Sequence, residues 1–103
     1  RQITQNGARA ISAIESLEGI NGVDIENARC EMAAIGGCTG SHLRPLSLAA
    51  TAVLHQLADC EIAAMCGVED WHSIIECLMM GATAVEMGSA MMLRGCGKRA
   101  ILP

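Results

Sequence analysis

Two short apolar runs, each ended by a turn of small residues, constrain the fold of this chain more than any other feature. Residues 62–68 read Ile-Ala-Ala-Met-Cys-Gly-Val, and residues 81–89 read Gly-Ala-Thr-Ala-Val-Glu-Met-Gly-Ser. Because the apolar stretches are short and lie next to glycine turns, they favour strands over 62–65 and 83–87. The segment 70–80 between them is typical of a helix. The order strand, turn, helix, strand, turn predicts two parallel strands joined by a helical crossover.

The same pattern extends toward the N-terminus. Residues 8–14 are rich in Ala and Ile and predict a strand, and Arg44-Pro45 marks a helix start. The expected buried stripe of this helix consists of Leu46, Ala50, Val53, Leu54 and Leu57. Asp70 is a plausible N-cap of the next helix, and Gly81 is placed to end it. The expected buried face of that helix consists of Trp71, Ile74, Ile75 and Leu78. A short last helix is expected over 90–93, ended by Gly95 and Gly97.

Alternating strands and helices predict an α/β fold with a parallel sheet. Three such units correspond to about three-eighths of a (β/α)₈ barrel, and a doubly wound sheet is the competing architecture. We expect residues 1–103 to form one partial barrel domain. Because the first residue is Arg1 rather than Met, in mid-pattern, we expect the chain to be part of a longer protein.

The segment between the first strand and the first long helix is too long for a simple turn. A small hairpin is expected there, with residues 22–25 as one arm and residues 30–35 as the other. Three glycines follow within residues 36–40, and they permit close approach of the backbone to a ligand. Loops of this size usually serve or cover a site.

Composition narrows the class of protein. Apolar residues make up 51% of the chain and charged residues 17%, which is enough apolar material for a core. No run reaches the roughly 20 apolar residues of a membrane helix, and no signal peptide is visible. We expect a cytoplasmic protein because its cysteines are expected to be reduced thiols. Because the net charge is −4 and the sequence has no basic patch, we do not expect the protein to bind nucleic acid.

Neither the cysteines nor the histidines predict a metal site. The chain has six cysteines and three histidines, and no cysteine pair has the Cys-x-x-Cys spacing. The gaps match neither a zinc site nor an iron–sulfur cluster. We expect reduced thiols packed as small hydrophobic side chains.

The carboxyl ends of the predicted strands carry the candidate site. If the strands are parallel, Glu15-Ser16, the turn 65–67 and the turn 88–89 all lie at one edge of the sheet, where such folds bind ligands. The backbone N–H groups of Cys66, Gly67, Gly88 and Ser89 would then hold a shared anion such as a phosphate. Two ordinary tight turns would give the same sequence. Glu86, beside this edge, is either a solvated residue or a polar residue of the site.

These segments together resemble the dihydroorotate/dihydropyrimidine dehydrogenase family, and within it most closely the FMN-bearing subunits of bacterial dihydropyrimidine dehydrogenases. The resemblance rests on residues 6–14, 19, 23–25, 37–40, 44–45, 66–71, 81–85 and 88–89. It implies the C-terminal part of a (β/α)₈ barrel that binds FMN at the carboxyl ends of its strands. The FMN-binding residues that it implies are Gly40, Met65, Cys66, Gly67, Gly88 and Ser89, and the substrate-binding residues are Glu15 and Ser16.

The implied activity is reduction of the C5=C6 bond of uracil or thymine, with NADH as ultimate electron donor. The alternatives are dihydroorotate oxidation, a non-redox phosphate-binding barrel such as an aldolase, and an inactive remnant. The resemblance implies a pyrimidine substrate, and either a homo-oligomer or a heteromer with an electron-transfer subunit. The family's catalytic cysteine lies upstream, so none of the six cysteines is expected to be catalytic, and iron–sulfur clusters would lie outside this segment.

Two positions depart from the family pattern. Glu15 stands where the family has Asn, which replaces a donor and acceptor with an acceptor only. Cys66 stands where the family usually has Gly, which adds a side chain beside the expected phosphate.

Overall fold

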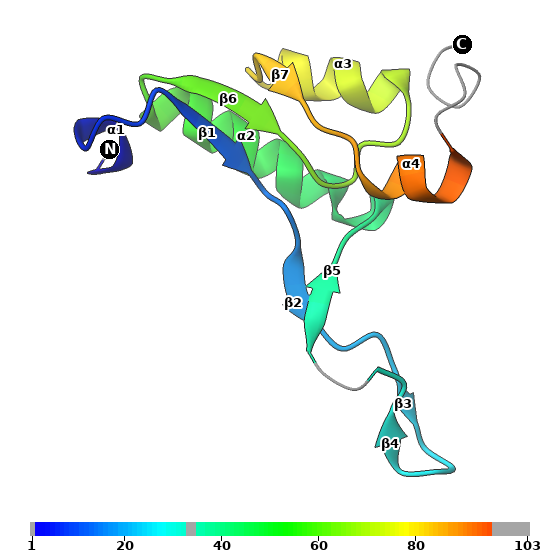
Figure 1. The fold of residues 1–103 in the computed structure, drawn as a ribbon. Helices are drawn as coiled ribbons and strands as arrows, with labels where there is room; N and C mark the ends of the chain where they lie inside the picture. Colours follow the sequence, from blue (N-terminus) through cyan, green and yellow to red (C-terminus); the bar gives the residue numbers. More distant parts are fainter. Residues whose placement is uncertain (1, 33–34, 96–103) are drawn as a thin grey trace.

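A three-stranded parallel sheet forms the body of the protein. The computed structural model describes residues 2–32 and 35–95. Strand β6 (Glu61–Ala64) lies between β1 (Ala10–Ala13) and β7 (Ala84–Val85), and both pairings are parallel (Figure 1). The three predicted strands are confirmed: β1 and β7 are shorter than expected, and β6 has the expected length but begins one residue earlier. The strand order follows the chain order without reversal, so the described sheet contains no switch point of the doubly wound kind.

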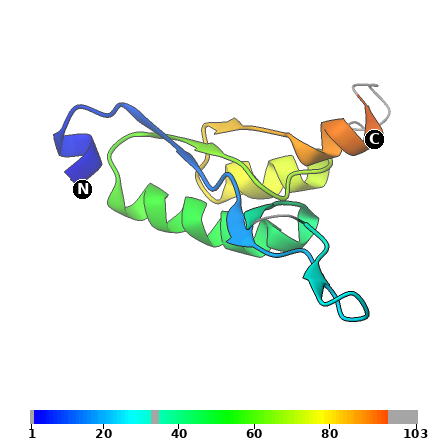
Figure 2. The same cartoon turned by 60° about the horizontal axis from the view of Figure 1, so that its bottom comes forward.

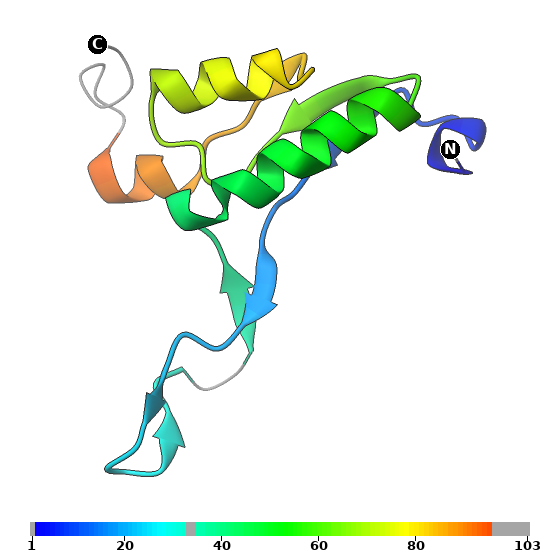
Figure 3. The ribbon, with the colours of Figure 1, turned by 180° about the vertical axis from the view of Figure 1, so that it is seen from behind.

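Two helices cover one face of this sheet. Helix α2 (Arg44–Leu57) packs on β1 and β6, and α3 (Trp71–Met79) packs on β7 and α2, while no helix among the described residues packs on the opposite face (Figures 2 and 3). The short elements are α1 (Gln2–Gln5), the 3₁₀ helix η1 (Ser41–Leu43) and α4 (Ser89–Arg94). The 3₁₀ helix η1 was not predicted. The strand residues that face α2 and α3, such as Ile62 and Ala64, are the most deeply buried side chains of the sheet.

The predicted buried stripe of α2 is wrong at three of its five positions, while Ala50 and Leu54 are half-buried. Leu46, Val53 and Leu57 are 49%, 52% and 55% exposed, whereas Ser47 and Thr51 are fully buried. The Ser47 hydroxyl donates to the Met65 carbonyl at 2.6 Å, and the Thr51 hydroxyl donates to the Ser47 carbonyl at 2.8 Å. Because both hydroxyls are hydrogen-bonded, these small polar side chains can be buried, and they allow the helix to approach an alanine-rich sheet closely.

The predicted buried face of α3 is also wrong in most of its positions. Only Ile74 packs against the core, while Trp71, Ile75 and Leu78 are exposed. The helix buries Ser73 and Cys77 instead, and burial raises the pKa of the Cys77 thiol. The core around them consists of Ala64, Val68, Cys77 and Ala82, with Leu48, Ile74, Val85 and Met87 packed against it.

The helix ends follow the predicted capping residues. Asp70 accepts from the Ser73 amide at 2.9 Å, and the Ser73 hydroxyl accepts from the Asp70 amide at 3.0 Å, which completes a capping box. Gly81 follows α3 with φ +105°, and Gly95 follows α4 with φ +76°. Gly97, the second predicted terminator of the last helix, lies outside the described residues.

A narrow arm of two short ribbons projects from the body. Strands β2 (Leu17–Gly19) and β5 (Gly36–Cys38) pair antiparallel at its root, and β3 (Val23–Asp24) and β4 (Arg29–Cys30) pair antiparallel at its tip (Figure 1). The predicted hairpin corresponds to the tip, but its strands are shorter than 22–25 and 30–35, and residues 33–34 lie outside the described part. The root pairing, which makes part of the predicted glycine loop a strand, was missed.

Residues 2–32 and 35–95 contain neither a membrane-spanning helix nor a cluster of metal ligands. No helix there is long and apolar enough to cross a membrane. The same residues contain no group of three potential metal ligands, and five of the six cysteines are free thiols. Cys96 falls outside the described residues.

Candidate functional site

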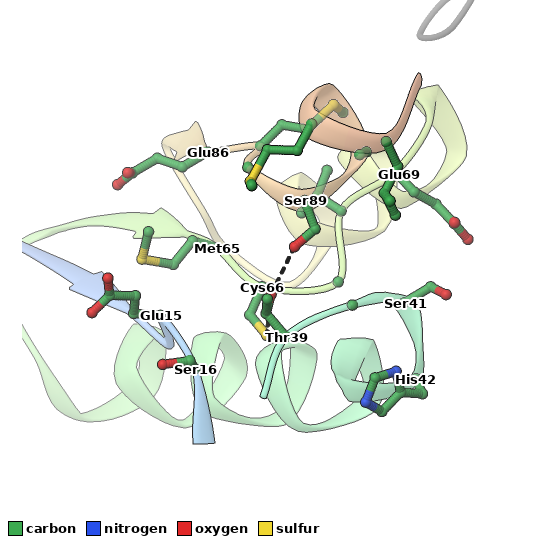
Figure 4. Close-up of a pocket in the computed structure, with 18 of the residues that line it drawn as sticks. Glu15, Ser16, Thr39, Ser41, His42, Met65, Cys66, Glu69, Glu86 and Ser89 are labelled. Carbon is green, nitrogen blue, oxygen red and sulfur yellow. Dashed lines mark hydrogen bonds between the residues drawn. The ribbon is translucent and has the colours of Figure 1, made fainter. Parts of the chain in front are cut away.

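An open pocket of about 670 Å³ lies at the carboxyl ends of the three strands. Its walls come from four separate parts of the chain: the end of β1, the segment after β5, the turn after β6 and the turn after β7 (Figure 4). All eight residues that the sequence predicted for the site line this pocket: Glu15, Ser16, Gly40, Met65, Cys66, Gly67, Gly88 and Ser89. The fold therefore brings the predicted site residues together.

The turn after β6 has an unusual backbone. Cys66 and Gly67 are both left-handed, with φ of +79° and +78°. A Cβ on Gly67 would lie 2.6 Å from the backbone nitrogen of Arg44, so only glycine fits there. The Met65 carbonyl is held by the Ser47 hydroxyl. These contacts fix the turn against the start of α2.

Within residues 2–32 and 35–95, several backbone amides at two turns of the pocket lack protein acceptors. Within the described part of the chain, the amides of Cys66, Gly67 and Ser89 have no protein acceptor. Ser89 begins α4, and the first amides of a helix have no partner inside the helix. A Cβ on Gly88 would meet nothing within 4 Å, so the backbone at this turn is open. Amide donors that converge on one cavity suit an anion with several oxygens.

Thr39 links the two turns and was missed by the sequence reasoning. Its hydroxyl lies 3.0 Å from the Ser89 hydroxyl and 3.8 Å from the Cys66 sulfur (Figure 4). The Cys66 side chain is buried and directed toward Thr39. Thr39 directly precedes Gly40 and lies two residues after Gly37, and this position could have singled it out as a side chain near a close backbone approach.

Glu86 lines the pocket and is also exposed to solvent, so it combines the features of both interpretations left open by the sequence. Its carboxylate accepts from the Ser12 hydroxyl at 2.6 Å, and the same hydroxyl lies 3.3 Å from the Met65 sulfur. Ser12 lies on the sheet face that carries no helix. In Figure 4 the side chains of Glu86 and Glu15 lie on the same side of the cavity, away from Glu69. One end of the pocket therefore carries two carboxylates.

Arg94 brings a guanidinium to the other end of the pocket. It lines the cavity and pairs with Glu69 at 3.1 Å, while Arg44 approaches the other Glu69 oxygen at 3.6 Å. Glu69 thus ties the end of α4 to the start of α2. Sequence reasoning missed Arg94, and its place in the last turn of a short helix gave no signal of a role in the site.

Comparison with known proteins identifies the family. The sequence model of the family described as dihydroorotate dehydrogenase matches residues 2–99. The chain is 32% identical over 92 residues to a dihydroorotate dehydrogenase B (NAD(+)), catalytic subunit, of Pyrococcus horikoshii, which covers 88% of this chain and 30% of that protein. The corresponding subunit of Thermococcus kodakarensis is 33% identical over 90 residues, which covers 86% of this chain and 30% of that protein.

A third relative belongs to a different type of the enzyme. The dihydroorotate dehydrogenase A (fumarate) of Limosilactobacillus reuteri is 31% identical over 87 residues, which covers 84% of this chain and 28% of that protein. The chain thus spans about 30% of the length of the curated relatives that it matches. These relatives favour dihydroorotate dehydrogenase, the sequence-based alternative, over dihydropyrimidine dehydrogenase. Because the family model covers nearly the whole chain, the chain belongs to the dihydroorotate dehydrogenase family.

Proposed function

We propose that this chain forms part of an FMN-dependent dihydroorotate dehydrogenase, and that it supplies the phosphate end of the flavin site and one edge of the substrate site. One observation carries the proposal. Eight residues, chosen from four separate parts of the sequence, line one cavity at the carboxyl ends of parallel strands in a member of this family. The whole protein would close these units into a (β/α)₈ barrel.

The hydrogen-bond donors at one end of the pocket suit a phosphate ligand. The amides of Cys66, Gly67 and Ser89 and the Ser89 hydroxyl are neutral donors that need no counter-charge of their own. Arg94 adds a guanidinium at the same end of the cavity, where its charge is partly balanced by Glu69. We infer that these groups hold the FMN phosphate, with Met65 and Gly88 in the same two turns. Gly40, with φ +132°, lets the backbone after β5 approach the flavin ring.

The side chains at the opposite end of the pocket suit a ligand ring that carries N–H donors. Glu15 and Glu86 offer carboxylate oxygens there, and the Ser16 hydroxyl can both donate and accept. A dihydropyrimidine ring has N–H groups and carbonyl oxygens on its edge, which match this set. We infer that Glu15 and Ser16 orient the substrate. The general base is proposed to lie outside this chain.

When bound, FMN would supply the redox chemistry by accepting a hydride as the C5–C6 bond of the substrate becomes a double bond. The contribution of this chain is positional. The two turns fix the phosphate, the segment after β5 sets the distance to the flavin, and Glu15 and Ser16 set the ring edge. Holding two reactants in register is a large part of catalysis.

The test uses the natural-length protein, purified and reconstituted with FMN. We expect flavin absorbance in the bound fraction, and its loss on anaerobic addition of dihydroorotate. A protein that stays colourless after reconstitution would exclude the flavin site. A protein that binds FMN and is reoxidised by uracil or thymine, but not reduced by dihydroorotate, would exclude the substrate and keep the cofactor.

The partners in the proposal follow from the same family. Two of the relatives are named as catalytic subunits of NAD(+) enzymes. We infer that this protein also passes its electrons to a separate electron-transfer subunit or acceptor, within the cytoplasm. Co-purification of a flavin- or iron–sulfur-containing subunit with the natural-length protein would support this assignment.

A further inference from the structure

The two glycines of β5 differ in the space around them. Neither Gly36 nor Gly37 has the positive φ that Gly40 has, so the backbone would accept a side chain at either position. A Cβ on Gly36 would lie 3.8 Å from the Met32 methyl carbon, which is an ordinary contact. A Cβ on Gly37 would lie 2.7 Å from the Ser16 hydroxyl oxygen and 3.1 Å from the Ser16 Cβ. The Ser16 hydroxyl therefore occupies the place of a side chain at Gly37.

The register of the root ribbon, formed by β2 and β5, accounts for this contact. Glu18 lies opposite Gly37, and Ser16 precedes Glu18 by two residues. Side chains two residues apart on a strand project from the same face, and so do those of directly opposed residues. Ser16 and Gly37 thus share one face of the ribbon, and the hydroxyl leans across the ribbon over the glycine.

This face of the root ribbon is a wall of the pocket. Ser16, Gly37 and Thr39 line the cavity, whereas Gly36 and Cys38 between them in register do not. The alternation is that of a strand with one face toward the cavity. Gly37 is therefore the position on this wall that has no side chain, next to two positions that carry hydroxyls.

The Ser16 hydroxyl is available to a ligand. Within residues 2–32 and 35–95 it has no hydrogen-bond partner, and Ser16 is exposed. In Figure 4 it lies beside Glu15, at the end of the pocket away from Glu69. A hydroxyl can both donate and accept, so its place decides which atom of a ring edge it can reach.

We propose that Gly37 is a positioning residue for the substrate, because its missing side chain provides the place that the Ser16 hydroxyl takes at the substrate end of the pocket; this role rests on the proposed function, in which Ser16 orients the substrate ring. Even one methyl group at position 37 excludes the hydroxyl from that place. The hydroxyl is the end of a short side chain that can rotate, and the 3.1 Å contact with the Ser16 Cβ requires a shift of only a few tenths of an ångström. The fold is kept while the substrate contact is lost.

Steady-state kinetics of the natural-length protein, reconstituted with FMN, test this role. For Gly37→Ala we expect the KM for dihydroorotate to rise about fivefold, because a hydrogen bond to the ring is lost. The Kd for FMN should stay within about twofold of the starting value. Gly36→Ala is the matched control, because it adds the same methyl group to the neighbouring residue outside the pocket. It should change neither constant by more than about twofold.

A double-variant cycle separates displacement of the hydroxyl from a general disturbance of the wall. Ser16→Ala alone should raise the KM by about the same factor as Gly37→Ala. If Gly37→Ala acts through the Ser16 hydroxyl, it has nothing left to displace in the Ser16→Ala protein. The double variant should then stay within about twofold of Ser16→Ala, whereas independent effects would multiply to about 25-fold.

Crystallography and thermal unfolding give readouts that do not depend on turnover. In a crystal structure of the natural-length Gly37→Ala protein, we expect the Ser16 hydroxyl to have rotated away from residue 37 while β2 and β5 remain paired. The Tm should fall by less than about 3 °C, because a rotating hydroxyl relieves the contact. A larger fall, or strands displaced with the hydroxyl still over residue 37, would overturn the proposal.

Different kinetic results would overturn the positioning role and the proposed function. A protein that binds FMN and oxidises dihydroorotate, but whose KM is unchanged by Gly37→Ala, would exclude the positioning role alone. Effects that multiply in the double variant would also exclude that role alone. A starting protein that binds FMN and is not reduced by dihydroorotate would exclude the proposed substrate, and with it the role of Ser16 and Gly37.

Discussion

At the scale of single residues, the pocket depends on two consecutive left-handed positions. Gly67 has this conformation because backbone atoms of Arg44 occupy the place of a side chain. Cys66 has it despite carrying a side chain, which costs about 1–2 kcal/mol for a residue other than glycine. The sequence identified Cys66 as a departure from the family pattern. The structure adds that Cys66 has a backbone conformation that glycine would adopt without this cost.

Replacement of Cys66 by glycine should therefore stabilise the protein. We expect Cys66→Gly to raise the free energy of unfolding by up to about 1 kcal/mol, because the φ of +79° no longer carries a penalty. FMN affinity should be kept or increased. Denaturant unfolding and FMN titration measure the two effects. Cys66→Ala is the control, since it keeps the backbone penalty, and a stabilisation by alanine equal to that by glycine would contradict the explanation.

Replacement by alanine should affect stability strongly at one glycine of the pocket and hardly at all at another. Gly67→Ala places a Cβ 2.6 Å from the Arg44 nitrogen at a φ of +78°, and we expect a loss of more than about 2 kcal/mol in unfolding free energy. Gly88→Ala meets nothing within 4 Å and should change stability by less than about 0.5 kcal/mol. Thermal unfolding of both variants distinguishes them, and equal losses would show that the turn after β6 is not held as described.

At the scale of elements, the helix ends were more predictable than the helix faces. Asp70 and Gly81 have local roles, a side chain that bonds nearby amides and a residue with positive φ, and local sequence identifies both. The buried face of α2 depends on what it packs against. An alanine-rich sheet and the hydrogen-bonded Ser47 and Thr51 override the apolar period, so periodicity selected the wrong side.

The capping box predicts a change of stability in acid. The Ser73 amide and hydroxyl hold the pKa of Asp70 below its usual value. The contribution of the carboxylate is therefore full at pH values above about 4 and is lost as the pH falls through the lowered folded value. Asp70→Ala should cost about 1 kcal/mol at neutral pH and should lose less stability than the starting protein below pH ~4.

Asp70→Asn is the matched control for this measurement, because asparagine caps helices without titrating. It should retain most of the stability at neutral pH and lose the acid dependence. Urea unfolding at a series of pH values measures both quantities. If Asp70→Asn showed the same decline in acid as the starting protein, the decline would come from other carboxyls.

At the scale of the whole molecule, the body leaves strand edges, one sheet face and apolar side chains exposed. Within residues 2–32 and 35–95, β1 and β7 each have an unpaired edge, and one face of the sheet carries no helix (Figure 2). The outer side of α2 exposes Leu46, Val53 and Leu57. These surfaces agree with the finding that the chain spans about 30% of its relatives. The proposed barrel would place further strands and helices on them.

Residues 1–103 expressed alone should neither catalyse nor remain monomeric. Open strand edges and exposed leucines favour association, and the proposed site lacks its general base. Light scattering after gel filtration and an anaerobic assay for flavin reduction by dihydroorotate measure the two properties. A stable monomer that reduces FMN with dihydroorotate would contradict the proposed division of the site.

The sequence predicted the order of strands and helices and the residues that meet at the pocket, because strand ends and glycine turns are local features that parallel pairing brings together. It missed Thr39 and Arg94. Thr39 reaches the site through the root ribbon and Arg94 through the last turn of α4, and both depend on long-range geometry. It also missed the pairing of β2 with β5, since two glycines in a three-residue strand resemble a loop.

The attachment of the arm has a consequence for binding. β2 begins directly after Ser16 and β5 ends directly before Thr39, so the root of the arm and two walls of the pocket are continuous backbone. Ordering the root therefore meets part of the entropy cost of ordering the pocket, and a ligand that orders the pocket also orders the root. FMN binding should slow hydrogen exchange of the β2 and β5 amides together with that of the turns after β6 and β7.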